Sequence, residues 1–520
     1  MKKIIISTIA ISALLVTTGC NHDFDTDVKD VVVTNGEANF SKYIALGNSL
    51  TSGYRDGALY SDGQNESYPS MIAGQMKLAG GGDFKQPLMP NNIGGFNNLP
   101  GFSGKYTLQV VGGSLTPVPS APAAALDNVS AGRPYQNLGV PGAKSYHLVA
   151  PGYGSAAGLS AGTANPYFVR FASSATTSVL ADAMSQAPTF FSLWIGSNDV
   201  LLYATSGGTN SSTTGGVTTY TPATVQPATA SPATYKSNDI SDPSVVAASI
   251  KGVLDGLKNV GATKGVIANV PYVTSIPYFT TVPYNPLTPA ALGSNLTTLN
   301  TSLYGPLKQA LTAFGAGDRI NLLSATSNNP VLIKDVALTD LSAQLTAALT
   351  PSLGAPTAAA FGQIFGQARQ ATSEDYILLT SSSVIGTVAP APVPSPVNVY
   401  GISYPLQNQH VLTKTEAGYV KTAIDAYNTS IKSLADTYGL AFVDAKAKML
   451  ELNGTSGISY DGVKYTAKFV SGGAFSLDGV HLTGRGYAIV ANEYIKAINA
   501  KYKSTLPWVD VNKYSGVKFP

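Results

Sequence analysis

Cysteine is almost absent from this chain, which has one, Cys20, among 520 residues. A single thiol cannot form an internal disulfide, and it cannot build a zinc site on several cysteines. Charge is sparse as well: Asp, Glu, Lys and Arg make up 12% of the sequence, about half the usual share. The formal charge is +3, and no run of Lys and Arg lies beyond the N-terminus. The chain therefore lacks the clustered basic surface that nucleic-acid binding requires.

Histidine is scarce too, and the four copies are His22, His147, His410 and His481. They form no His/Asp cluster at metal-ligand spacing, which makes a metal-dependent phosphoesterase a poor alternative. We expect neither a metal nor an organic cofactor. Beyond the N-terminus, no apolar run is long enough to span a bilayer.

The N-terminus has the pattern of a lipoprotein signal peptide over residues 1–19. Lys2 and Lys3 precede an apolar segment, and Thr17-Thr18-Gly19-Cys20 follows it. Acyl chains on Cys20 would anchor the protein to the membrane, and an ordinary secretory signal is the alternative. Residues 20–38 are predicted to be a flexible tether, whose acidic start resembles the surface-export signals of Bacteroidetes lipoproteins. The predicted location is the cell envelope, as an outer-membrane lipoprotein on its periplasmic or surface face.

Short apolar runs in the mature chain predict buried strands. They lie at residues 43–46, 190–195, 265–270 and 440–444. Helical patterns follow at 244–260 and 484–500, and a third begins after Thr413, which has capping-box spacing to Glu416. Alternating strands and helices favour a doubly wound α/β sandwich. We expect one domain over 39–520 with insertions at about 55–134, 205–242 and 271–409, the second of them mobile.

Ser49 directly follows the first predicted strand and Gly47-Asn48. In open α/β sheets, ligands bind at the carboxyl ends of the strands, so this hydroxyl is a candidate nucleophile. The same Gly-x-Ser-Leu pattern recurs at Gly112-Gly113-Ser114-Leu115. That copy precedes a proline-rich stretch and no helix, and we discount it.

Asp478 and His481 lie in one loop before the C-terminal helical pattern. An Asp three residues before a His can accept the Nδ1 proton and leave Nε2 free to take the proton of a serine. A serine hydroxyl needs such a base because it is barely nucleophilic by itself. This spacing places His481 ahead of the other histidines as the general base.

Two further blocks offer hydrogen-bond donors at strand ends. Residues 137–145 contain Gly142 where a strand turns into a predicted helix, and Asn198 follows the apolar run at 190–195. A backbone amide and an asparagine side chain are suitable donors to the oxyanion of an ester intermediate. A turn glycine and a helix cap are the structural alternatives.

Together the four blocks, in this order, resemble the GDSL family of lipases and esterases, also called SGNH hydrolases. The resemblance implies Ser49, Asp478 and His481 as the catalytic triad. It implies an oxyanion hole formed by Ser49, Gly142 and Asn198. It also implies a flavodoxin-like three-layer α/β/α sandwich around a five-stranded parallel sheet. The family's Asp before the serine is Asn48 here, which we expect to tune activity without abolishing it. The Gly-x-Ser-x-Gly elbow of α/β-hydrolases is absent around Ser49.

The expected activity is hydrolysis of carboxylic esters through an acyl-enzyme. The substrate is expected to be an acyl lipid or an acetylated glycan, and the sequence leaves both open because specificity lies in the insertions. A non-catalytic glycan-binding lipoprotein on the same fold is the main alternative. A repeated Pro-Tyr pattern at Pro271-Tyr272, Pro277-Tyr278 and Pro283-Tyr284 is interpreted as packing, with an aromatic rim around a cleft as the other reading.

Overall fold

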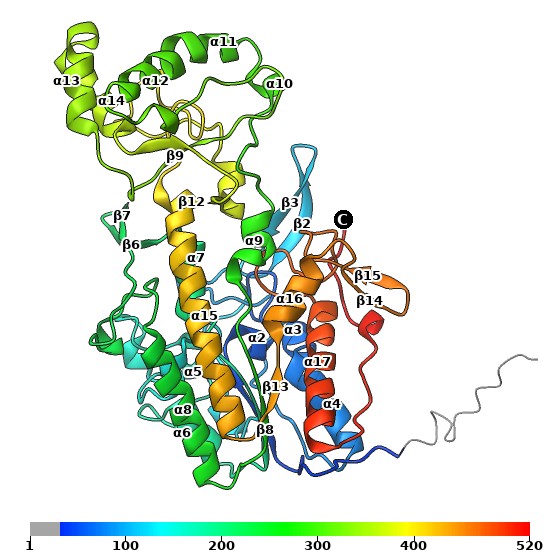
Figure 1. Cartoon of the computed structure of the whole chain (residues 1–520). Coiled ribbons are helices and arrows are strands. Elements are labelled where there is room, and N and C mark those ends of the chain that lie inside the picture. Colours follow the sequence, from blue (N-terminus) through cyan, green and yellow to red (C-terminus); the bar gives the residue numbers. More distant parts are fainter. Residues whose placement is uncertain (1–31) are drawn as a thin grey trace, which may run out of the picture.

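The computed structural model describes residues 32–520 of the chain (Figure 1). The predicted signal peptide, Cys20 and most of the predicted tether lie outside the described residues.

The centre of the protein is a five-stranded parallel sheet, as predicted. Its strands, in chain order, are β1 (Tyr43–Gly47), β4 (Asn137–Gly139), β5 (Phe190–Trp194), β8 (Gly265–Ala268) and β13 (Ala441–Val443). Their order across the sheet is β4-β1-β5-β8-β13, and all neighbours pair in parallel. Numbered along the chain this order is 2-1-3-4-5, one of the two common orders of doubly wound sheets. The order reverses between β1 and β5, so a ligand crevice is expected at the carboxyl ends of these two strands.

Helices cover both faces of the sheet (Figure 1). On one face α8 (Pro243–Asn259) packs against α15 (Lys414–Thr437), and on the other α4 (Tyr68–Leu78) packs against α17 (Gly484–Tyr502). The predicted helices are thus present, and Thr413 and Glu416 form the predicted capping box at the start of α15. The strands are buried on both faces, which explains why they read as continuous apolar runs.

The first two insertions contain β-hairpins. Strands β2 (Tyr106–Val111) and β3 (Ser114–Pro119) form one, and β6 (Thr209–Thr214) and β7 (Val217–Pro222) form the other. The discounted Ser114 begins β3 directly after the two glycines of the hairpin turn, and no helix follows it. The composition of the second insertion predicts a mobile segment. In the structure, the buried Asp239 carboxylate accepts hydrogen bonds from four residues of this segment.

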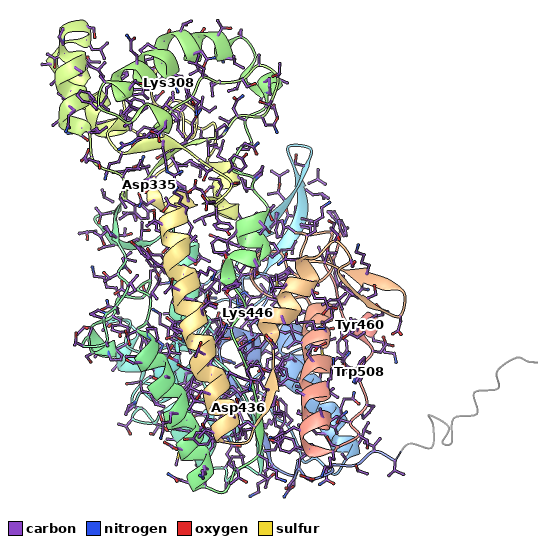
Figure 2. The ribbon with its side chains drawn as sticks, in the orientation of Figure 1. Lys308, Asp335, Asp436, Lys446, Tyr460 and Trp508 are labelled. Carbon is purple, nitrogen blue, oxygen red and sulfur yellow. The ribbon has the colours of Figure 1, made fainter. Side chains whose placement is uncertain are left out.

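The third insertion forms a lobe with a hydrophobic core of its own, made by side chains between Leu287 and Val411. Its main elements are α10 (Pro289–Leu292), α11 (Asn295–Leu299), α12 (Gly305–Thr312), β9 (Leu332–Lys334), α13 (Ser342–Leu353), α14 (Ala355–Phe365) and β10 (Ala368–Gln370). The lobe lies beyond the carboxyl ends of the sheet strands (Figure 1). Figure 2 labels Lys308 and Asp335 in this lobe. It also labels Asp436 at the C-terminal end of α15, the end away from the lobe.

Within residues 32–520, no helix combines the length and the apolar character needed to cross a bilayer.

Candidate active site

Ser49 lies at the sheet's carboxyl edge, where the strand order reverses. It begins the short helix α2 (Ser49–Ser52), and the Asn48 side chain caps this helix by accepting the Leu50 N–H at 3.1 Å. Asn and Asp are equally good at this capping position, so Asn48 preserves the local geometry. Ser49 is 7% exposed. Its hydroxyl makes no hydrogen bond within the described chain and is not among the fully buried, unpartnered polar atoms there, so solvent can reach it.

Two backbone N–H groups, one after strand β1 and one after strand β4, are free to donate a hydrogen bond. The Ser49 amide is at the first position of α2, where no carbonyl of the helix can accept from it. Gly142 follows the neighbouring strand β4, is exposed, and has φ +81°. Among residues 32–520, neither amide donates a hydrogen bond. Free amides at adjacent strand ends are what an oxyanion requires.

Asn198 starts helix α7 (Asn198–Thr205) directly after β5. Its side-chain amide donates one hydrogen bond to the Ala143 carbonyl at 2.9 Å, and an amide NH₂ has a second hydrogen to donate. The next residue, Asp199, is fully buried and accepts both the backbone N–H and the hydroxyl of Ser145, at 2.8 and 2.9 Å. These contacts tie the loop after β5 to the loop that holds Gly142.

The predicted contact between Asp478 and His481 is present in the structure. Asp478 Oδ2 lies 2.8 Å from His481 Nδ1, and Oδ1 accepts the backbone N–H groups of His481 and Val480 at 2.8 and 2.9 Å. Burial alone would raise the pKa of Asp478, but the imidazole and these donors hold it well below its ordinary value. The carboxylate therefore stays ionised and directs the Nδ1 proton toward itself, leaving Nε2 as an acceptor.

Tyr54 connects helix α2, which begins at Ser49, to the loop that carries His481. Its backbone N–H donates to the Ser49 carbonyl at 3.0 Å, and its ring centroid lies 4.7 Å from that of His481. The Tyr487 hydroxyl holds the Tyr54 carbonyl at 2.6 Å. Within residues 32–520, no hydrogen bond joins the Ser49 hydroxyl to His481. Catalytic hydrogen bonds often tighten only when substrate binds, and the loop contacts place the two side chains on the same edge of the sheet.

The other described histidines have structural surroundings. His147 stacks on Tyr153 with centroids 4.4 Å apart, and its Nδ1 accepts the Lys144 N–H. Burial, with the Lys144 charge, lowers the pKa of His147 to about 4, so it is neutral at physiological pH. His410 packs edge-on against Tyr400 beside the inserted lobe. These contacts account for both histidines as structural residues.

Sequence reasoning missed Asp56, which contacts the loop that carries Asp478 and His481. Its Oδ1 accepts the Leu477 N–H at 3.0 Å, and its own N–H donates to Ser476 Oγ at 2.9 Å. Ser476 Oγ in turn donates to Asp478 Oδ1 at 3.1 Å, and the Gly57 N–H donates to Oδ2 at 2.9 Å. Asp56 has φ +53°, a conformation that aspartate tolerates better than most residues. The Asp56-Gly57 pair signals a turn in the sequence, but nothing there indicates a partner 421 residues away.

Replacing Asp56 with alanine is expected to lower kcat of the predicted ester hydrolysis by about 10- to 100-fold. This factor corresponds to the loss of one charge-assisted hydrogen bond. The variant leaves the Leu477 N–H unpaired and loosens the loop that carries Asp478. Asp56→Asn should recover most of the rate, because its amide oxygen still accepts from Leu477 and asparagine tolerates positive φ. The pH profile of kcat provides the second readout. Equal rates in wild type and Asp56→Ala would show that the contact does not position the triad.

Two local expectations need adjustment. The helix predicted after Gly142 is only a 3₁₀ turn at Ser145–Leu148, and Pro151, which cannot continue a helix, follows shortly after it. In the Pro-Tyr repeat, the Tyr272 hydroxyl donates to Asp425 at 2.6 Å and Tyr284 packs against the core of the inserted lobe, as the packing interpretation predicts. Tyr278 is different, because its N–H donates to the Gly479 carbonyl at 2.9 Å, between Asp478 and His481. The inserted segment thus contacts the loop that carries Asp478 and His481.

No family model, curated protein or solved structure matches the chain.

Proposed function

We propose that the protein is a serine esterase or lipase of the GDSL (SGNH) type. The observation that carries the proposal is the Asp478–His481 contact in a loop held to the segment after Ser49. Free amides of Ser49 and Gly142 at adjacent strand ends support it. A binding module has no need of an ionised Asp hydrogen-bonded to a His in a loop that is tied to the segment after an unpartnered serine hydroxyl.

The proposed reaction is acyl transfer in two steps. Ser49 Oγ attacks the ester carbonyl carbon while His481 Nε2 takes the hydroxyl proton, and the amides of Ser49 and Gly142 stabilise the oxyanion. The bond to the alcohol oxygen breaks as His481 returns the proton to it. Water then attacks the acyl-enzyme, giving its proton to His481, and the acid leaves as Ser49 recovers the proton.

A phosphonofluoridate tests this assignment directly, because it phosphonylates activated serines irreversibly: Oγ attacks phosphorus and fluoride leaves. Treating the full chain and mapping the modified peptide by mass spectrometry should place the adduct on Ser49. Ser49→Ala should lose the label, and Ser114→Ala, which removes the other Gly-x-Ser-Leu serine, should keep it. An adduct on another residue would reject Ser49, and no adduct at all would favour the non-catalytic glycan-binding alternative.

Asn198 is proposed as the third oxyanion donor. Asn198→Ala is expected to reduce kcat by about 10²- to 10³-fold with little change in KM, since the second N–H acts only on the transition state. Asn210→Ala, which removes a buried asparagine of the second insertion, is the matched control and should retain the wild-type rate. If the rate of Asn198→Ala equals that of wild type, another group serves as the third donor.

The envelope location is proposed from the N-terminal sequence alone, since Cys20 lies outside the described residues. Acylated Cys20 would hold the enzyme on the membrane near its substrate. Cys20→Ser should move the protein from the membrane fraction to the soluble fraction on cell fractionation. Retention of this variant on membranes would contradict the lipid anchor.

A further inference from the structure

An apolar cavity of about 110 Å³ lies directly behind the catalytic loop. It is bounded by α16 (Ala445–Asn453), α17 and the carboxyl ends of β5 and β13. Figure 1 shows α16 and α17 on the same side of the sheet. Among the lining side chains are Trp194, Met449, Leu452 and Ile489. The cavity is therefore part of the sandwich and not of the inserted lobe.

The cavity shares a wall with the proposed catalytic residues. Leu50, which follows Ser49, lines it, and so do Val480 and Leu482, which flank His481. The loop is closed on itself, because the Ser476 N–H donates to the His481 carbonyl at 2.8 Å. The cavity wall therefore includes the direct sequence neighbours of both the proposed nucleophile and the proposed base.

The lining chemistry suits a hydrocarbon chain. The two charged lining residues, Lys448 and Glu493, are paired with each other at 3.0 Å, so they offer no unpaired charge to a ligand. A linear apolar occupant would withdraw both the cavity lining and its own surface from water, which is favourable.

We propose that this cavity receives the acyl chain of the substrate, so that the enzyme acts on esters of acyl chains several carbons long and not on acetylated glycans. The proposal rests on the esterase function proposed above. With the carbonyl carbon at Ser49, the chain enters between Leu50 and the Val480–Leu482 segment. Each methylene that the cavity accepts should raise kcat/KM about fourfold until the cavity is full.

The first test measures hydrolysis of p-nitrophenyl acetate, butyrate, hexanoate and octanoate by the full chain. Wild type should prefer the longer chains. Met449→Phe, which fills the cavity, should lower the octanoate-to-acetate ratio of kcat/KM at least about tenfold, and Leu452→Ala, which enlarges it, should shift the optimum to longer chains. Lys496→Phe, an exposed position of α17, is the control and should retain the wild-type ratio.

A preference for acetate in wild type, or unchanged ratios in both Met449→Phe and Leu452→Ala, would overturn the acyl-chain assignment while leaving the esterase function standing. Absence of hydrolysis of every ester would instead contradict the proposed function. The two failures are therefore distinguishable.

A second test uses the position of the two tryptophans and does not depend on turnover. Trp194 lines the cavity, whereas Trp508 is 57% exposed and lies beside Tyr460 on the outside of the sandwich (Figure 2). In Ser49→Ala/Trp508→Phe, titration with decanoate should change Trp194 emission saturably, and Met449→Phe should abolish the change. An emission spectrum that decanoate does not alter would reject the cavity as the chain's site.

Discussion

Replacing His481 with alanine is expected to lower kcat of ester hydrolysis by about 10⁴- to 10⁶-fold, because Ser49 then has no base to take its proton. Within residues 32–520 the two other histidines are occupied elsewhere: burial lowers the pKa of His147, whose Nδ1 already accepts the Lys144 N–H, and His410 packs against Tyr400. The residual rate should come from the oxyanion donors and substrate binding alone. Steady-state kinetics with a short ester provides the measurement.

His410→Ala is the matched control for this loss, since it removes a partly buried imidazole outside the site. It should turn over at the wild-type rate, and both variants should show wild-type circular dichroism. A His481→Ala enzyme with normal turnover would overturn the triad assignment.

Asp478→Asn is expected to reduce kcat by about 10⁴-fold, because an amide favours the wrong imidazole tautomer. Asp478 Oδ2 faces two donors, the Gly57 N–H and the His481 Nδ1–H, and Oδ1 faces three more. An asparagine must place its NH₂ against one of these groups of donors. The variant should therefore also unfold at lower temperature than wild type.

The pH dependence of this stability loss has a defined sign. The pKa of Asp478 is lowered in the folded state, so its stabilising contribution is complete above about pH 4, the unfolded value, and is lost as the pH falls further. The difference in unfolding free energy between wild type and variant should be full at pH 6 and shrink in stronger acid. Asp461→Asn, in the β14–β15 turn, should show neither effect. Wild-type activity in Asp478→Asn would mean that the carboxylate does not orient His481.

The central sheet was predictable because its strands are buried on both faces and therefore stand out as short apolar runs. Strand β4 was harder, since it has only three residues and its pairing with β1 depends on contacts far apart in sequence. The core of the inserted lobe was not foreseen, because its side chains are spread over more than one hundred residues without a clear period. Alternating strands and helices thus identify a layered architecture, whereas the interior of a long insertion does not follow from local pattern.

At the site, the Asp478–His481 contact could be predicted from the sequence, because a spacing of three residues within one loop brings the two side chains together. Asp56 did not, because its contact with Leu477 requires two loops that only the complete fold brings together. The same holds for the Asn198 contact with Ala143 and for the apolar cavity behind the loop. Local chemistry was visible in the chain, and support from distant segments was not.

The most direct measurement of the central claim is hydrolysis of p-nitrophenyl esters by the full chain beside its Ser49→Ala and Ser114→Ala variants. Wild type and Ser114→Ala should turn over equally, and Ser49→Ala should show almost no activity. Turnover that survives in Ser49→Ala, or its absence from the wild type on every ester tried, would contradict the assignment of Ser49 as the nucleophile of a serine esterase.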